Sequence, residues 1–99
     1  MAFGITKEEL VSWKSKVNAG QLAFLTHYWF DPRFPACKTV TKVGCNDRAR
    51  LTAWCRDNGL DPSRIHDRTG YPHFDLMGAR QKQILLREQL HDQVRRFKL

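Results

Sequence analysis

The stretch QLAFLTHYWF, residues 21–30, is dense in aromatic and aliphatic side chains. Apolar residues occupy both of its alternating positions, which is typical of a β-strand covered on two faces. Asp31-Pro32 ends the stretch, and a second extended segment is expected over residues 38–44, where Thr and Val alternate with Lys. These two segments predict a small sheet that helices cover.

Two helices flank the predicted strands. Thr6 and Glu9 form a capping box at the start of the first helix, and Gly20 supplies its C-terminal stop. The second helix is expected over residues 47–58, with Asn46 as its N-cap. In both helices apolar side chains recur at spacings of three and four, as expected of stripes that face a core: Leu10, Trp13, Val17, Leu51, Trp54 and Cys55.

The last third of the chain predicts a hairpin and one long helix. Residues 64–76 have the pattern of two strands joined by a turn at Thr69-Gly70. The helix is expected over residues 78–97, with a core stripe of Leu86, Leu90, Val94 and Phe97. The order α-β-β-α-β-β-α, in a single domain over residues 1–99, predicts a small α/β or α+β fold.

Composition narrows the class of protein. With 99 residues, 41% of them hydrophobic and 27% charged, the chain is expected to be globular. It has no apolar run near the ~18 residues of a membrane helix and no basic-then-apolar secretion signal. We therefore expect a cytoplasmic protein with no membrane partner. The three cysteines, at positions 37, 45 and 55, fit neither a disulfide framework nor a C-x-x-C zinc site, which favours reduced thiols.

The chain is strongly basic. Seventeen Lys and Arg against ten Asp and Glu give a net charge of +7, and the surplus is spread along the sequence. Such a surplus favours a phosphate-bearing partner, because each neutralised phosphate releases counterions. The residues expected to bind nucleic acid are the basic ones of the predicted hairpin and last helix: Arg64, Arg68, Arg80, Arg87, Arg95 and Lys98.

The predicted hairpin carries a cluster of chemically active side chains. A two-residue turn at Thr69-Gly70 would place His66 directly opposite His73, on the same face as Asp75. We call His66, His73 and Asp75 the His–Asp cluster. Opposed side chains have Cβ atoms about 5 Å apart, so the two imidazoles would be able to act on one ligand. The same register places Arg64 opposite Asp75, which also allows a solvated polar face with no chemistry.

Besides the solvated polar face, two chemical interpretations of the His–Asp cluster remain open. With His27 or Asp31 as a fourth ligand, its nitrogens and oxygen are able to hold Zn²⁺ or Mn²⁺ and activate a water for phosphodiester hydrolysis. Without a metal, the two imidazoles are able to serve as general base and general acid while Arg64 or Arg68 stabilises developing charge, as a ribonuclease requires.

A group of aromatic residues with one Arg follows the first predicted strand: Trp29, Phe30, Arg33 and Phe34. These side chains suit stacking on exposed bases, and they equally suit a core or a protein interface.

Three function classes follow from these features. The first is a binder of a phosphate-bearing partner, with nucleic acid as the leading candidate. The second is a small phosphodiesterase or nuclease that uses the His–Asp cluster. The third is a protein-interaction module, a regulator or inhibitor that docks through residues 29–34. Pro72 implies an edge strand, which leaves room for a homodimer.

The motif YPHFDL (71–76), followed by a helix with an early Arg80, resembles a small uncharacterised bacterial domain family. In that family a Pro-His-Tyr-Asp-Ile-like motif precedes an Arg-bearing helix, and an earlier helix ends in a glycine-leucine step, as residues 51–60 do here. The resemblance covers residues 24–86 and implies a hairpin followed by a helix. The family offers no activity that could be transferred to this chain. It marks three residues for the first tests: His73, Asp75 and Arg80.

Overall fold

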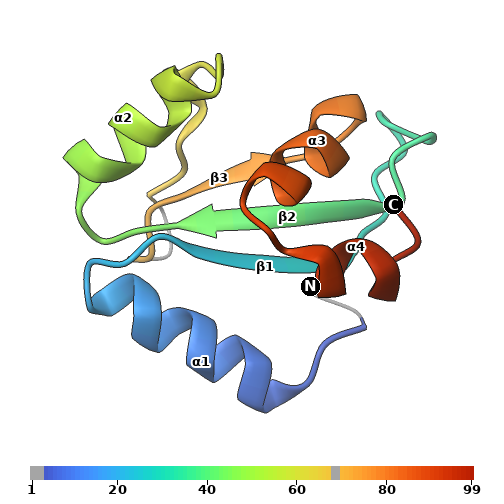
Figure 1. Ribbon diagram of the computed structural model, residues 1–99, viewed down its shortest axis with the longest axis horizontal. Helices are drawn as coiled ribbons and strands as arrows, with labels where there is room; N and C mark the ends of the chain where they lie inside the picture. The colour runs from blue at the N-terminus through green and yellow to red at the C-terminus, as the bar shows by residue number, and fades with distance from the viewer. Residues whose placement is uncertain (1–3, 68–69) are drawn as a thin grey trace.

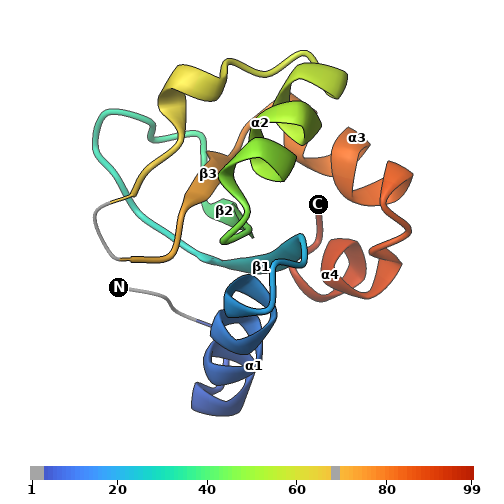
Figure 2. The same ribbon diagram turned by 90° about the vertical axis from the view of Figure 1, so that its left-hand side faces the viewer.

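The computed structural model describes residues 4–67 and 70–99. In chain order its elements are α1 Lys7–Asn18, β1 Ala23–Tyr28, β2 Thr39–Gly44, α2 Arg48–Asp57, the 3₁₀ turn η1 Pro62–Arg64, β3 His73–Leu76, α3 Ala79–Arg87 and α4 His91–Arg96. The strands form one antiparallel sheet in the order β1-β2-β3. Helix α1 covers one face, α2 and α3 lie on the other, and α4 lies beside β1 (Figures 1 and 2). The fold is α+β, as predicted.

One core lies between the sheet and helices α2 and α3. Val43 of β2 and Phe74 and Leu76 of β3 point to this side, because side chains alternate along a strand. They pack against buried side chains of the two helices and of neighbouring segments: Cys45, Leu51, Trp54, Cys55, Ile65 and Ile84. The apolar stripe predicted for the helix after β2 is confirmed.

A second core lies between the sheet and α1. Trp13 and Val17 of α1 are buried against Ala23 and Leu25 of β1. The Trp13 indole N–H donates to the backbone oxygens of Ala23 (3.1 Å) and Lys42 (3.2 Å), so this one side chain attaches α1 to two strands. The first strand is therefore covered on both faces, as predicted.

The local signals at the helix ends mostly agree with the structure. The Thr6 hydroxyl accepts from the Glu9 N–H (3.1 Å), and the Glu9 carboxylate accepts from the Thr6 N–H (2.9 Å), which completes the capping box. Gly20 follows the end of α1 with φ +79°. Helix α2 begins one residue later than predicted: Asp47, not Asn46, is the N-cap, and its carboxylate accepts an N–H three residues on (3.1 Å).

A chain of buried polar side chains crosses the sheet on the α3 side. The Thr39 hydroxyl donates to Gln81 Oε1 (3.1 Å), and Gln81 Nε2 donates to the Thr41 hydroxyl (3.0 Å). The Thr41 and Thr26 hydroxyls are 2.6 Å apart, and the Thr26 hydroxyl donates to Gln93 Oε1 (2.6 Å). Since each member has a partner, the chain is compatible with burial, and it attaches α3 and α4 to the strands.

The predicted hairpin is wrong in its first arm. Residue 64, where the first strand of the hairpin was expected to begin, instead ends the 3₁₀ turn η1, because Pro62 follows an Asp that caps the turn. Among the described residues of this arm, only His66 pairs, through two backbone hydrogen bonds with His73 (2.8 and 3.0 Å). The opposition of His66 and His73 is confirmed, whereas Arg64 lies in η1 and does not pair with Asp75. Thr69, the first residue of the predicted Thr69-Gly70 turn, lies outside the described residues, as does residue 68.

The single helix predicted over residues 78–97 is also wrong. The chain breaks between α3 and α4 at Gln89, which has a left-handed φ of +60°. The break lets α3 pack on the sheet while α4 turns to the edge of β1. The side chains that α3 buries are Gln81, Ile84 and Leu85. Leu86, which was predicted to lie in the core stripe, is exposed. Of the predicted stripe, Leu90 and Val94 are half-buried and only Phe97 is fully buried.

Candidate functional site

The His–Asp cluster assembles where the isolated bridge of residue 66 meets β3. His66 Nε2 lies 3.5 Å from Asp75 Oδ2, and His73 Nε2 lies 3.6 Å from Asp75 Oδ1. The two imidazole centroids are 5.4 Å apart, with the rings inclined at 35°. Each oxygen of one carboxylate is thus approached by a different imidazole, and two titratable rings share one acid.

The two imidazoles differ in environment. His73 is buried, its ring lies edge-on to Trp13 (centroids 6.3 Å apart), and its Nδ1 is 2.8 Å from the Tyr71 carbonyl oxygen. A carbonyl only accepts, so Nδ1 carries the hydrogen and Nε2 turns its lone pair to Asp75 in the neutral ring. The His66 side chain is 41% exposed. The solvated-face interpretation is therefore wrong for His73, and only His66 is open to a ligand from solvent.

The other predicted metal ligands lie elsewhere. His27 is buried on β1, and burial lowers the pKa of its imidazole below the usual value. Asp31 sits in the loop after β1 and is held by the Arg33 guanidinium. Within residues 4–67 and 70–99, no group of three or more His, Cys, Asp or Glu side chains is arranged to hold a metal ion. The Zn²⁺ or Mn²⁺ hypothesis thus finds no assembled ligand set in this part of the chain.

The basic residues predicted to bind nucleic acid are distributed over several elements. Arg64 of η1 and Arg87 of α3 are exposed. Arg80 donates to the Asn58 carbonyl at the end of α2, and Arg95 pairs with an acid one turn earlier in α4. Because the predicted helix is divided, these residues do not form one flank. Arg68 lies outside the described residues.

Lys98 lies in a basic groove that the sequence did not reveal. The groove, about 640 Å³, lies between the loop before β2, the start of α3 and the end of α4, at the end of the sheet where the C-terminus lies (Figure 1). Lys38 and Lys98 line it and are exposed, and no described side chain that lines it is acidic. Lys38 was missed because its neighbours predicted a strand, and no local pattern relates it to a residue sixty positions later.

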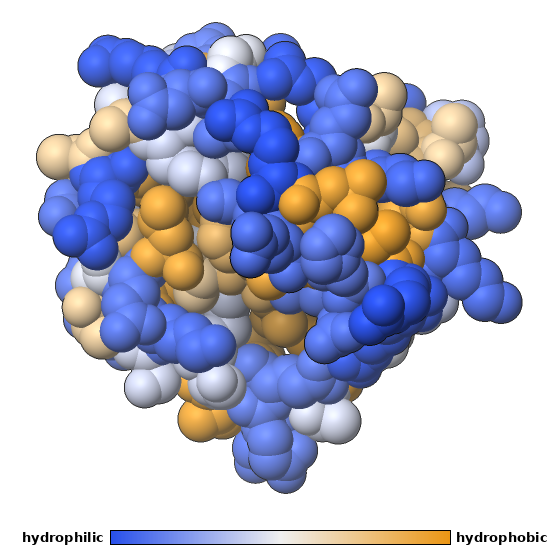
Figure 3. Space-filling model, viewed as in Figure 1, coloured by the Kyte–Doolittle hydropathy of each residue, from blue (hydrophilic) through white to orange (hydrophobic). Residues whose placement is uncertain are grey.

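A second groove, of about 340 Å³, lies between α1 and β1 and has the opposite character. Trp13, Phe24 and Leu25 contribute its apolar walls, and Glu8 and Glu9 lie at its rim. Figure 3 views the molecule from the same side as Figure 1. It shows hydrophobic residues in a hollow near the middle of that side, with hydrophilic residues around them. This lining contains Lys16 beside the two glutamates and so has no excess of positive charge, whereas the groove of Lys38 and Lys98 has one.

Comparison with known proteins adds one close relative. Over 99 residues, all of both chains, the sequence is 52% identical to the "Uncharacterized protein YneQ" of Bacillus subtilis (strain 168). The chain belongs to the YneQ family. No family model and no solved structure matches it.

The YneQ relationship bears on two expectations from the sequence. It places the chain in a family of uncharacterised proteins, and it spans the segment before residue 24 that the resemblance over 24–86 did not cover. The name of YneQ states no substrate or partner. No helix in the described part of the chain is long and apolar enough to cross a membrane.

Proposed function

We propose that this member of the YneQ family binds nucleic acid through its phosphates, at the groove of Lys38 and Lys98. The observation that carries the proposal is the pairing of two exposed ammonium groups with a lining that has no acidic side chain among the described residues. Lysine ammonium groups in a concave surface attract phosphates and release their counterions.

The charge around the groove supports the same proposal. Residues 79–99 contain six basic residues against two acidic ones, and so carry four of the seven net positive charges. Some of these charges are already matched: Arg95 pairs with Asp92, and Arg96 pairs with Glu9. Lys98 has no ion pair among the described residues, so its charge is available for a phosphate.

The proposal is tested by binding of labelled, mixed-sequence RNA and DNA oligonucleotides, measured by fluorescence anisotropy across a salt series. Each phosphate contact contributes roughly 0.7 to 0.9 to the slope of log K against log salt. The double variant Lys38→Gln/Lys98→Gln should therefore lower the magnitude of that slope by about 1.4 to 1.8.

A matched control removes the same charge from α1, which contributes no residue to the lining of the groove. Lys7 and Lys16 are exposed on α1, and the Lys7→Gln/Lys16→Gln variant should keep the wild-type slope. An equal loss of slope in both double variants would show that net charge, and not the groove, determines binding. Flat anisotropy at low salt would overturn the proposal and move the search to a protein partner.

A second candidate function, phosphodiesterase activity, is favoured by one observation, the approach of two imidazoles to the Asp75 carboxylate. General acid–base catalysis needs one ring that accepts a proton and one that donates it, both near neutral pH. The same oligonucleotide samples, run on a gel, test this candidate. Cleavage by the wild type that is lost in His66→Ala and His73→Ala, with binding unchanged, would establish an enzyme. Intact oligonucleotides with the wild type would exclude it.

A further inference from the structure

The loop over residues 29–38, which we call the aromatic loop, exposes aromatic rings to solvent. Phe30 is 78% exposed and Phe34 is 44% exposed, and neither belongs to either of the two cores. The loop has three aromatic residues and no Leu, Ile, Val or Met. An exposed apolar patch generally marks a binding site, and exposed aromatic rings offer flat faces on which a planar partner is able to stack.

The rings are held in place by the loop itself. Trp29 and Phe34 are stacked, with centroids 6.2 Å apart and planes inclined at 26°, and the Arg33 guanidinium lies 5.5 Å from the Phe34 centroid. Arg33 is in turn fixed by Asp31, which accepts from its side chain and from its backbone N–H (2.9 Å). A ligand that stacks here meets a surface that is already ordered, which lowers the entropic cost of binding.

The aromatic loop leads directly into the basic groove. The Trp29 N–H donates to the Lys38 carbonyl (2.9 Å), which closes the base of the loop, and Lys38 then lines the groove beside Lys98. The Arg33 charge is matched by Asp31, so the lysines are the groups available to phosphates. The aromatic loop and the basic groove therefore meet at Lys38, which belongs to both.

We propose that the nucleic acid bound by this protein is single-stranded, and that its bases stack on Phe30 and Phe34 while its phosphates follow Lys38 into the groove. This inference rests on the proposed function and specifies its ligand. In a duplex the base faces are stacked on one another, whereas a single strand presents them, and aromatic rings beside a basic groove are the usual combination for binding it.

The test uses four labelled probes of about 12 nucleotides, within the range of single-strand sites. They are single-stranded RNA, single-stranded DNA, a duplex of the same sequence, and an abasic strand that keeps the phosphates. The variant is Phe30→Ser, because Phe30 makes no ring pair with any described residue and its removal leaves the cores intact. The control is Val11→Ser, which removes a 56% exposed apolar side chain from α1.

The wild type should bind both base-bearing single strands more tightly than the abasic strand and the duplex. Phe30→Ser should raise the Kd for the base-bearing strands at least about fivefold and leave the Kd for the abasic strand unchanged. Val11→Ser should change neither value. A second variant, Phe34→Ser, should weaken the same strands, with far-UV circular dichroism confirming that it folds.

The outcomes separate the two proposals. Equal affinity for the base-bearing and abasic strands, or an unchanged Kd in Phe30→Ser, would overturn stacking and leave phosphate binding standing. Tighter binding of the duplex would do the same. If none of the four probes binds at low salt, the proposed function itself fails, and the aromatic loop would then be a surface for a protein.

Discussion

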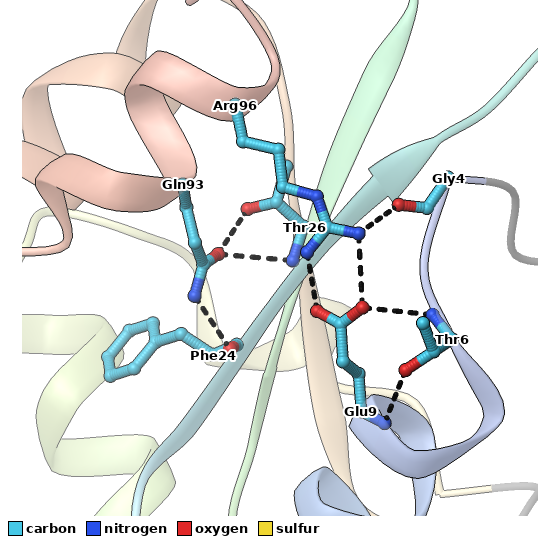
Figure 4. Close-up of polar contacts among 7 residues, drawn as sticks. All are labelled: Gly4, Thr6, Glu9, Phe24, Thr26, Gln93 and Arg96. Atoms are coloured by element: carbon cyan, nitrogen blue, oxygen red, sulfur yellow. Dashed lines mark hydrogen bonds and ion pairs between the residues drawn. The ribbon is translucent and has the colours of Figure 1, made fainter.

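The side chain of Gln93 pairs with the backbone of Thr26 in the way that a neighbouring strand would. The Thr26 N–H donates to Gln93 Oε1 (3.1 Å), and Gln93 Nε2 donates to the Phe24 carbonyl (3.0 Å), as Figure 4 shows. β1 is the edge of the sheet, so both backbone groups point away from β2. One amide from α4 satisfies them and closes that edge.

Gln93→Leu should therefore both destabilise the protein and promote its self-association. The variant leaves a part-buried N–H and a carbonyl without partners, which costs about 1–3 kcal/mol of unfolding free energy. It also opens an edge strand to pairing with another copy. Urea denaturation and size-exclusion chromatography measure the two effects. Gln83→Leu, at an exposed position on α3, is the control, and equal behaviour of the two variants would contradict the role given to Gln93.

Gly44→Ala should destabilise the protein by about 2–3 kcal/mol through overpacking. A Cβ at this position would lie 2.5 Å from the Trp13 ring and 2.7 Å from Val17, and both side chains are fixed in the core under α1. Gly20→Ala is the comparison, because nothing lies within 4 Å of its Cβ and only the left-handed φ of +79° is strained. That variant should cost about 1 kcal/mol. Chemical denaturation that ranks Gly20→Ala as the worse variant would refute the packing argument.

The ion pair of Glu9 with Arg96 should make stability depend on acid. Hydrogen bonds from Arg96 and from the Thr6 backbone lower the pKa of Glu9 from 4.5 to about 2. A lowered carboxyl pKa contributes stability above the unfolded value, and that contribution is lost as the pH falls from about 4.5 to 2. Glu9→Gln keeps an N3 residue able to complete the capping box and removes the charge.

At pH 7 Glu9→Gln should lower Tm by about 2–4 °C, the size expected of a partly exposed ion pair in a domain of this length. The difference from the wild type should shrink as the pH falls to 2. Glu8→Gln lies in the same first turn and has no ion pair among the described residues. A pH-independent difference for Glu9→Gln, or an equal effect of Glu8→Gln, would argue against this account.

The buried imidazole of His27 should make the protein less stable below neutral pH. Burial lowers the pKa of His27, and the Tyr28 carbonyl 2.9 Å from Nδ1 offsets this only in part. The unfolded chain then binds a proton more readily than the folded one, so stability is full above about pH 6.5 and falls below it. The limiting slope for one proton is about 1.4 kcal/mol per pH unit.

His27→Asn places an amide near Nδ1 and removes the titration, so its unfolding free energy should change less between pH 7.5 and 5.5 than that of the wild type. His91→Asn is the control, since His91 is exposed on α4. Urea denaturation at each pH gives the comparison. If the wild-type slope persists in His27→Asn, another group is responsible.

Much of the fold follows from short-range patterns, and most of the remainder from contacts between distant residues. The Thr6–Glu9 capping box and the opposition of His66 and His73 are local, since each depends on only a few neighbouring residues. The break at Gln89 has no Gly or Pro to mark it, and the contact of α4 with β1 that accompanies it joins residues 67 positions apart. No sequence pattern relates Gln93 to Thr26.

In the candidate site, too, features that depend on neighbouring residues were predictable and those that depend on distant residues were not. The cluster around Asp75 was predictable, because alternation along a strand and the length of a turn decide which side chains meet. The groove of Lys38 and Lys98 was not, because two segments far apart in the chain form it. The exposure of Phe30 was hidden for another reason, since an apolar residue after a strand usually predicts burial.

The closure of β1 by Gln93 has a consequence for synthesis of the protein. A ribosome makes β1 well before α4, so the edge of β1 has no cover from Gln93 until that residue has left the exit tunnel. During that interval the nascent chain presents open backbone groups, which are the sites where edge strands of neighbouring chains join. The packing of α4 on β1 therefore determines when a newly made molecule is protected from edge-to-edge association with other chains.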